Sequence, residues 1–216
     1  MKKWIVSIIL ILELCINCVD VLPCQASYNG KIYAAYRTKL RSINKKWTKI
    51  YSDWNVDGVS YFTYHDFNND GIKELIIVRK NYGANKNTTK INCATDIAIY
   101  TYYNGKVKSL VYSVTGGGTW GGYYVHQDSP YIISYGRGGA VQEDYDYYKI
   151  SSGKKKKVAS ASCIPVDYNN IEKGIIYKVQ GERVKEKQYN SYVAKMGGKK
   201  SLKAYKITTK NIATCK

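Results

Sequence analysis

The sequence predicts an α+β fold, in which one domain is built on an antiparallel β-sheet meander with a helix near each end. Short segments rich in β-branched and aromatic residues follow one another through the middle of the chain. The links between them are shorter than the dozen or more residues that a parallel crossover needs. Apolar residues at helical spacing occur near both ends of the chain.

The first residues have the layout of a secretory leader. Lys2 and Lys3 precede an apolar run from Trp4 to Leu12, and Ala26 is a small residue suited to cleavage. Glu13 ends the run well short of the roughly 18 residues of a membrane-spanning helix, which makes an uncleaved anchor the less favoured alternative. We expect a signal peptide over residues 1–26 and a single extracellular domain over residues 27–216. That domain would contain no transmembrane segment, and it would be secreted or held at the cell surface.

The first element of the expected domain is an amphipathic helix over Tyr28–Asn44, started by Ser27 or Asn29. Its apolar residues recur every three or four positions, at Ile32, Tyr36, Leu40 and Ile43.

Strands follow at once, over Val59–Tyr64 and Leu75–Val78. In the next segment, Asn104-Gly105 separates two β-rich runs and predicts a tight hairpin. The later strands are expected over Tyr123–His126, Tyr131–Tyr135, Glu143–Ile150 and Lys156–Ala161. A second helix contains Tyr189 to Met196 and ends at Gly197-Gly198.

The chain is strongly basic, with 34 Lys and Arg against 16 Asp and Glu and a net charge of +18. From Ser151 to Lys216 there are 16 basic residues and only four acidic ones. A field of this sign attracts anionic polymers such as nucleic acid or wall glycan. A solvated basic surface that only aids solubility is an equal alternative.

Three cysteines, Cys93, Cys163 and Cys215, remain after the expected cleavage. An oxidising exterior would allow one disulfide, in any of three pairings, and would leave one free thiol. We expect one bridge, and the chain is not a disulfide framework.

The stretch HDFNNDGIKELIIV, His65–Val78, carries the clearest chemical signal. Asp66, Asn68 and Asp70 alternate, Gly71 permits a sharp bend, and Glu74 follows before an apolar strand. With the carbonyl of Ile72, these residues offer the hard oxygen ligands that Ca²⁺ prefers. Zn²⁺ would need His or Cys at such positions, and His65 lies just outside the set.

The spacing resembles the calcium loop of FG-GAP repeats, in which D-x-[DN]-x-D-G-x-x-[DE] joins two strands. The resemblance covers Asp66 to Val78 and occurs once, so it does not imply a propeller. The later stretches IYTYYNGKVKSL and YYVHQDSPYIISYGRGG also resemble segments of small secreted or surface-anchored proteins of Gram-positive bacteria that carry one such loop. The resemblance of the loop implies that the calcium ligands are Asp66, Asn68, Asp70, Ile72 and Glu74. The helix-loop-helix calcium site does not fit, because Ile77 stands where that site has a bidentate Glu.

The affinity of such a loop should be modest, at roughly 10⁻⁴ to 10⁻³ M, and the ion should be structural. The alternative is a plain hairpin loop in which Asp and Asn bond their own backbone as Asx-turns.

Candidate catalytic groups are few, because His65 and His126 are the only histidines in the chain. A secreted hydrolase would use His126 with an acidic or a cysteine partner, and Cys163 is the candidate cysteine. Glu143, Asp144 and Asp146 form the densest acidic cluster, in which Asp144 and Asp146 share a strand face and could serve as a glycosidase pair, with charge balance for nearby lysines as the alternative. No nucleophile elbow, zinc-protease motif or Walker loop is present. The sequence therefore favours a non-enzymatic binding module stabilised by Ca²⁺.

Two further segments are candidate ligand surfaces. Trp120, Tyr123 and Tyr124 could form a stacking platform for a sugar ring or a peptide side chain, with packing as the alternative. The run Lys154, Lys155, Lys156 and Lys157 is expected at a solvated hairpin tip, where it could contact an anionic polymer.

Overall fold

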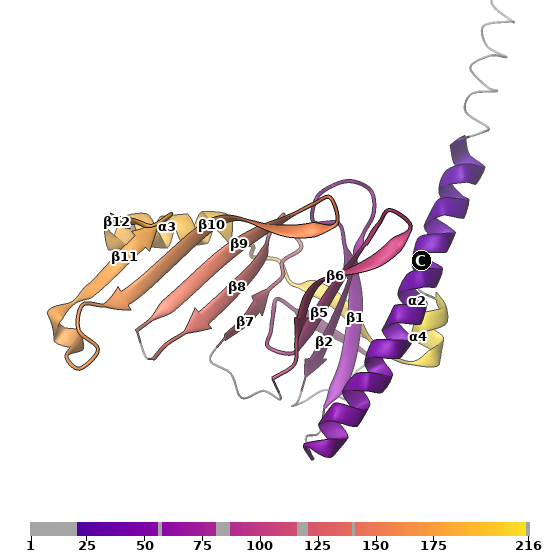
Figure 1. Cartoon of the computed structure of the whole chain (residues 1–216), viewed down its shortest axis with the longest axis horizontal. Coiled ribbons are helices and arrows are strands. Elements are labelled where there is room, and N and C mark those ends of the chain that lie inside the picture. Colours follow the sequence, from indigo (N-terminus) through magenta and orange to yellow (C-terminus); the bar gives the residue numbers. More distant parts are fainter. Residues whose placement is uncertain (1–20, 56–57, 81–86, 116–120, 140, 215–216) are drawn as a thin grey trace, which may run out of the picture.

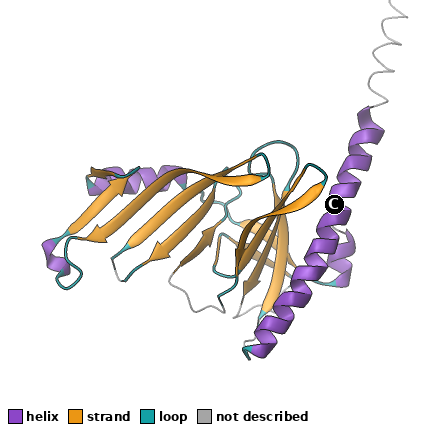
Figure 2. Ribbon diagram, viewed as in Figure 1, coloured by secondary structure: helices purple, strands orange, loops and turns teal. Residues whose placement is uncertain are grey.

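A computed structural model of the chain describes residues 21–55, 58–80, 87–115, 121–139 and 141–214, with the backbone alone for 21–28. In chain order the elements are α2 (Val21–Asp53), β1 (Val59–His65), β2 (Glu74–Lys80), β3 (Thr88–Ile91), β4 (Cys93–Ala94), β5 (Ile97–Tyr103), β6 (Lys106–Ser113), β7 (Gly121–Tyr124), β8 (Ile132–Arg137), β9 (Glu143–Ser151), β10 (Lys154–Pro165), the 3₁₀ turn η1 (Ile171–Lys173), β11 (Ile175–Val179), β12 (Glu182–Val184), α3 (Glu186–Met196), β13 (Leu202–Lys206) and α4 (Thr209–Thr214). The described residues are largely β (Figure 2).

The strands form two antiparallel sheets, as Figure 1 shows. The first, sheet A, has the order β3-β13-β1-β2-β5-β6, and the second, sheet B, has the order β12-β11-β10-β9-β8-β7-β4. Every described pairing is antiparallel, which confirms the prediction made from the short links. The chain enters sheet B at β4, returns to sheet A for β5 and β6, forms β7 to β12 in sheet B, and adds β13 to sheet A, so the meander is divided over two sheets.

The central strands of sheet A, β1, β2 and β5, are buried on both faces. Along β2, Ile76 and Val78 face a core shared with sheet B, while Leu75 and Ile77 face a second core beneath α2. Successive side chains of a strand point to opposite faces, so a strand covered on both sides becomes a continuous apolar run. This is why the segment from Leu75 to Val78 is apolar without alternation.

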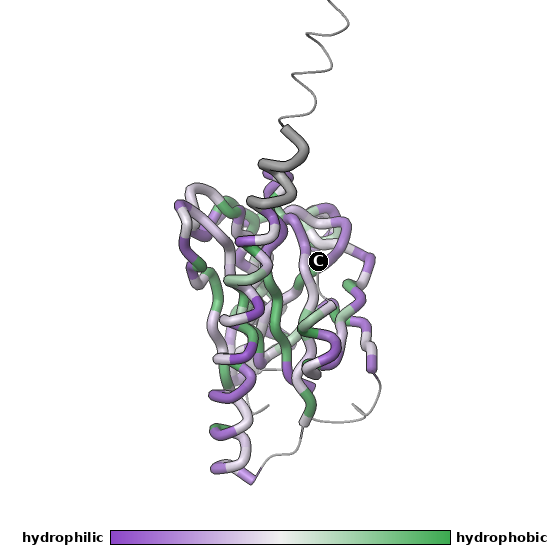
Figure 3. Tube along the Cα trace, turned by 90° about the vertical axis from the view of Figure 1, so that its right-hand side faces the viewer, coloured by the Kyte–Doolittle hydropathy of each residue, from purple (hydrophilic) through white to green (hydrophobic). Residues whose placement is uncertain are grey.

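The long helix α2 covers the outer face of sheet A. Its buried side chains recur at helical spacing and are, in order, Ile32, Tyr36, Leu40, Ile43, Trp47 and Tyr51. Seen from the helix, the apolar strands of sheet A lie directly behind it (Figure 3). Full burial of one side chain such as Leu40 contributes about 1.5–3 kcal/mol, so this row fixes the helix on the sheet.

The predicted N-terminal helix is present, but its predicted bounds are wrong. Helix α2 continues to Asp53, nine residues beyond Asn44, because Trp47 and Tyr51 prolong the apolar row. It already begins at Val21, so neither Ser27 nor Asn29 starts it. None of the described helices combines the length and apolar character needed to span a membrane.

The second predicted helix is confirmed as α3, which lies on the face of sheet B that points away from sheet A. There Tyr189 packs with Ile133, Tyr147 and Cys163 in a third core. The C-terminal region also holds a further helix, α4, whose Ile212 packs into the core beneath α2. The expectation of a single helix near each end is therefore wrong at the C-terminus.

The hairpin at Asn104-Gly105 is confirmed. Asn104 and Gly105 have φ angles of 51° and 76°, the left-handed conformation that tight hairpins require. They join β5 to β6 with Tyr103 opposite Lys106.

Candidate functional site

The candidate calcium loop joins β1 to β2, two central strands of sheet A. The pairing runs from Val59 opposite Lys80 to His65 opposite Glu74, and residues 66–73 form the connection. Asn69 and Gly71 adopt left-handed backbone with φ of 55° and 83°, and an added Cβ at Gly71 would meet nothing within 4 Å. Glycine is therefore required at position 71 because the backbone is left-handed, and not because a side chain would clash.

Hydrogen bonds close the loop on itself. One carboxylate oxygen of Asp66 accepts the N–H of Asp70 at 3.3 Å and the other accepts the N–H of Gly71 at 2.9 Å. Asp70 accepts the N–H of Ile72 at 2.8 Å and the side-chain amide of Asn68, also at 2.8 Å. These contacts are the Asx-type bonds of the plain-loop alternative. An ionised carboxylate has about four acceptor positions, so each of these carboxylates keeps capacity for a cation.

Glu74 lies at the bottom of the loop and is fully buried. Its Oε2 accepts the N–H of Phe67 at 3.1 Å and its Oε1 accepts the hydroxyl of Thr101 at 3.0 Å. Burial raises the pKa of Glu74 to about 7, and the nearby carboxylates of Asp70 and Asp66 add to the rise against the two hydrogen bonds. The described ion pairs join other residues, so Asp66, Asp70 and Glu74 have no basic partner among the described residues.

Asn68 supplies a buried acceptor that has no partner. Its Oδ1 is shielded from solvent and receives no hydrogen bond in the described part of the chain. An unsatisfied buried oxygen is costly and calls for a donor or a cation. Asn68 stands between Asp66 and Asp70 in the loop, so this oxygen fits the donor set of a calcium ion.

The five predicted ligands are therefore on one loop, but their side chains are not all gathered around one point. Within the described residues, no group of three or more His, Cys, Asp or Glu side chains lies close enough together to hold a metal ion by itself. A site here would depend on the amide oxygen of Asn68 and the carbonyl of Ile72 as well as on the carboxylates. His65 packs edge-on against Phe67 with ring centroids 4.6 Å apart.

A cavity of about 260 Å³ lies between sheet B and the C-terminal end of α3, and sequence analysis did not predict it. Its sheet side is formed by Tyr124, His126, Ile133, Tyr145 and Tyr147. These residues come from β7, from the segment after it, and from β8 and β9. Their aromatic character was visible in the sequence, whereas the crossing of α3 over these strands was not.

The other side of the cavity is formed by Val193, Ala194 and the segment from Gly197 to Lys199. Asp128 holds this segment in place, because its carboxylate accepts the N–H of Lys199 at 3.0 Å and that of Lys200 at 2.9 Å. A methyl group at Gly198 would overlap the Cβ of His126. Only glycine allows the segment to approach His126 this closely.

His126 does not pair with Cys163 or with the acidic cluster on β9, and the carboxylate that acts on its pKa is that of Asp128. Cys163 donates its thiol hydrogen to the carbonyl of Val141 at 3.2 Å and does not line the cavity. Asp146 pairs with Lys157 at 2.5 Å, and it shares a face of β9 with Asp144. His126 lies by the opposite face, beside Tyr145 and Tyr147.

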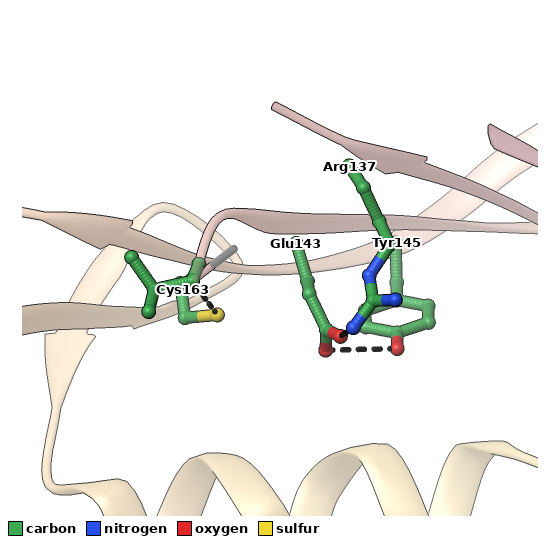
Figure 4. A network of polar contacts seen from close by, with 5 residues as sticks. Arg137, Glu143, Tyr145 and Cys163 are labelled. Carbon is green, nitrogen blue, oxygen red and sulfur yellow. Dashed lines mark hydrogen bonds and ion pairs between the residues drawn. The ribbon is translucent and has the colours of Figure 1, made fainter. Parts of the chain in front are cut away.

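The third acidic residue of that cluster, Glu143, belongs to a separate network that Figure 4 shows. Glu143 accepts hydrogen bonds from Arg137 at 2.9 Å and from the hydroxyl of Tyr145 at 3.1 Å. Its charge is therefore balanced by Arg137. No Ser, Thr, Cys, Asp or Glu is among the described residues that line the cavity.

The three predicted platform residues do not act together. Tyr123 packs toward the core between the sheets, whereas Tyr124 packs toward α3, because consecutive residues of β7 face opposite sides. Trp120 lies outside the described residues.

The four-lysine run begins β10 and does not form the hairpin tip, which is Ser152-Gly153. Lys155 lies over the ring of Tyr148, 4.5 Å from its centroid, and Lys157 pairs with Asp146 on the same face. Lys154 and Lys156 alternate to the other face. The run is thus divided between two surfaces of sheet B.

The cysteine prediction is tested for two of its three residues. Cys93 and Cys163 are free thiols, so they are not joined to each other. The thiol of Cys93 donates to the hydroxyl of Tyr135 at 3.3 Å. Cys215 lies outside the described residues.

Comparison with known proteins gives no match of any kind: no model of a known protein family fits the chain, and neither a curated protein nor a solved structure resembles it.

Proposed function

We propose that this protein is an exported, non-enzymatic binding module in which the loop from Asp66 to Glu74 holds one structural Ca²⁺ ion. The observation that carries the calcium proposal is the buried, partnerless Oδ1 of Asn68, which lies among carboxylates that lack a basic partner in the described part of the chain. A bound cation would balance these carboxylates, of which Glu74 is fully buried.

The residues that would hold the ion are those of the predicted set. Asp66, Asn68 and Asp70 would offer side-chain oxygens, Ile72 its carbonyl, and Glu74 a carboxylate. Oxygen donors of this number and kind suit Ca²⁺ better than Mg²⁺, which keeps most of its water and demands a near-ideal octahedron. A bound Ca²⁺ would neutralise the carboxylates and tie the loop to the strands on either side of it.

Two features support an exported module without catalysis. All the buried side chains described for α2 lie from Ile32 onward, so cleavage after Ala26 would leave that row intact. The cavity beside His126 offers no Ser, Thr or Cys and no carboxylate among its described lining residues. The serine or cysteine that a histidine base would activate is therefore missing from that described lining.

Calcium titration of residues 27–216, followed by the NMR amide shifts of Phe67 to Ile72, tests the proposal. We expect saturable shifts confined to the loop and its flanking strands, with a Kd of roughly 10⁻⁴ to 10⁻³ M. Asp66→Asn should abolish them. Asp53→Asn removes the same charge from an exposed position at the end of α2 and should leave them unchanged. Shifts scattered over the surface, or equal loss in both variants, would refute the loop as the site.

A second candidate function is binding of an anionic polymer, which the uncompensated positive charge favours. The chain has 34 basic residues against 16 acidic ones, so 18 positive charges remain without an acidic counterpart. Because the lysine run is divided between two faces, such binding would be diffuse and strongly dependent on salt.

A further inference from the structure

We propose that the cavity between sheet B and the end of α3 binds a small planar aromatic molecule, of one or two rings, that carries a hydroxyl or ring N–H group. This names a ligand class for the binding module and therefore rests on the proposed binding role, but not on the calcium loop, since no loop residue lines the cavity.

The first argument is size and shape. The cavity has a volume of about 260 Å³, and an apolar cavity of about 150 Å³ is enough for benzene. One or two fused rings therefore fit, whereas an extended polymer does not. The walls are fixed by the fold itself: strands β7 to β9 carry one side, and Asp128 ties the opposite segment through Lys199 and Lys200.

The second argument is the surface that a ligand would meet. The rings of Tyr124 and His126 are nearly parallel, with 12° between their planes and centroids 5.9 Å apart. Tyr145 and Tyr147 come from β9 and line the same cavity, and Ile133 and Val193 add apolar side chains to the lining. Aromatic walls contact a flat ring by stacking or edge-to-face packing, each of which adds to the burial of its area.

The third argument is a pair of buried polar atoms without partners. His126 is 7% exposed and Tyr147 is 1% exposed, and neither the Nδ1 of His126 nor the hydroxyl of Tyr147 has a hydrogen-bond partner in the described part of the chain. Both residues line the cavity. Both atoms are closed to solvent, so a ligand hydroxyl would reach either one only after a small shift of the imidazole or tyrosine ring, and it would then repay the desolvation that the fold leaves uncompensated.

Two other ligand classes fit less well. A sugar would bury four or five hydroxyl groups against walls that offer only a few polar atoms, and each unpaired hydroxyl would oppose binding. A quaternary ammonium ion favours aromatic walls. However, the one charged residue of the described lining is Lys199, which would repel such a cation. Glu143, which accepts a hydrogen bond from Tyr145, is already paired with Arg137 and would not attract it.

NMR titrations of residues 27–216 with phenol and indole test this inference, with cyclohexanol, N-acetylglucosamine and tetramethylammonium as comparison probes. We expect saturable binding of the two aromatic probes, at least ten-fold tighter than any comparison probe. Contacts between ring protons of the bound phenol and the methyl groups of Ile133 and Val193 should appear as intermolecular nuclear Overhauser effects in the wild-type protein. Equal affinity for cyclohexanol, tighter binding of the sugar or the ammonium ion, or contacts elsewhere would overturn the assignment.

Variants on α3 and β9 test the position of the bound ligand. Ala194→Trp places an indole at the mouth of the cavity and should weaken phenol binding at least ten-fold. Ser191→Trp adds the same bulk to an exposed position on the same helix outside the cavity and should change it less than two-fold. Tyr147→Phe should weaken phenol several-fold but leave toluene unchanged, because only the hydroxyl partner is lost. Equal weakening by both tryptophan variants would contradict the site.

The same titrations in excess chelator separate this inference from the calcium proposal. We expect phenol to bind with unchanged affinity, because the loop and the cavity lie on different sheets. Loop shifts with calcium but no phenol binding would refute the proposed cavity ligand and leave the calcium proposal standing. Phenol binding without any response to calcium would refute the calcium proposal and leave the cavity ligand standing.

Discussion

The hydroxyl of Thr101 donates a 3.0 Å hydrogen bond to the carboxylate of Glu74, although 27 positions separate the two residues in the chain. Glu74 is the last residue of the candidate calcium loop pattern and the first of β2, while Thr101 lies on the neighbouring strand β5. Both side chains are buried. The loop is therefore joined to the centre of sheet A through a polar contact inside the core.

Thr101→Val should destabilise the calcium-free protein. Valine has the shape of threonine but cannot donate, so it leaves the Oε1 of Glu74 buried without this partner, at a cost of about 1–3 kcal/mol. Urea unfolding in chelator measures the change in the free energy of unfolding. Thr101→Ser keeps the hydroxyl and should cost less than Thr101→Val. The reverse order would show that the methyl group, and not the hydrogen bond, matters at this position.

Gly71→Ala should destabilise the fold through backbone conformation alone. A Cβ there meets nothing within 4 Å, but φ is 83°, and an alanine in left-handed backbone costs about 1–2 kcal/mol. Gly136→Ala is the matched control, because its Cβ also meets nothing within 4 Å and its φ is not in the left-handed region. Thermal unfolding of both variants compares them. Equal destabilisation would contradict a conformational role for Gly71.

The His126 imidazole should titrate below the pKa of about 6.5 that is usual for histidine. Burial lowers the pKa of His126, and the carboxylate of Asp128 acts in the opposite direction. Lys199 and the hydroxyls of Tyr124, Tyr145 and Tyr147 are the other ionisable groups of the described cavity lining. A folded pKa below the unfolded one means that this contribution to stability is present above pH 6.5 and is lost as pH falls through the folded value.

NMR titration of the two histidines measures this, with His126→Gln used to assign the signals. The pKa of His65 is also lowered by burial, so the assignment decides the result. A midpoint for His126 at or above 6.5 would contradict its burial beside the cavity.

The middle of sheet A and the Asn104-Gly105 hairpin could be predicted because their signals are local. Apolar runs such as Leu75 to Val78 and a two-residue turn need no knowledge of distant partners. The end of α2 was missed because Lys45, Lys46 and Lys49 surround Trp47 and conceal the continuing apolar row. Strand β13 was missed because its neighbours β1 and β3 lie more than a hundred positions away.

The candidate site shows the same division between local and distant information. The loop residues from Asp66 to Glu74 are a contiguous pattern and were predicted as a set, while the contact to Thr101 depends on the register of β2 and β5 and was not. The cavity depends on how α3 lies over β7 to β9 and on how Asp128 holds the segment after α3. Neither spacing nor composition contains that information.

Thermal unfolding of residues 27–216 in millimolar Ca²⁺, millimolar Mg²⁺ or chelator is the most direct test of the calcium-stabilised module. An ion that binds only the folded chain raises the melting temperature. We predict a higher melting temperature in Ca²⁺ than in Mg²⁺ or chelator, and no such difference in Asp70→Ala. Identical melting of the wild-type protein in Ca²⁺ and in chelator would contradict the account.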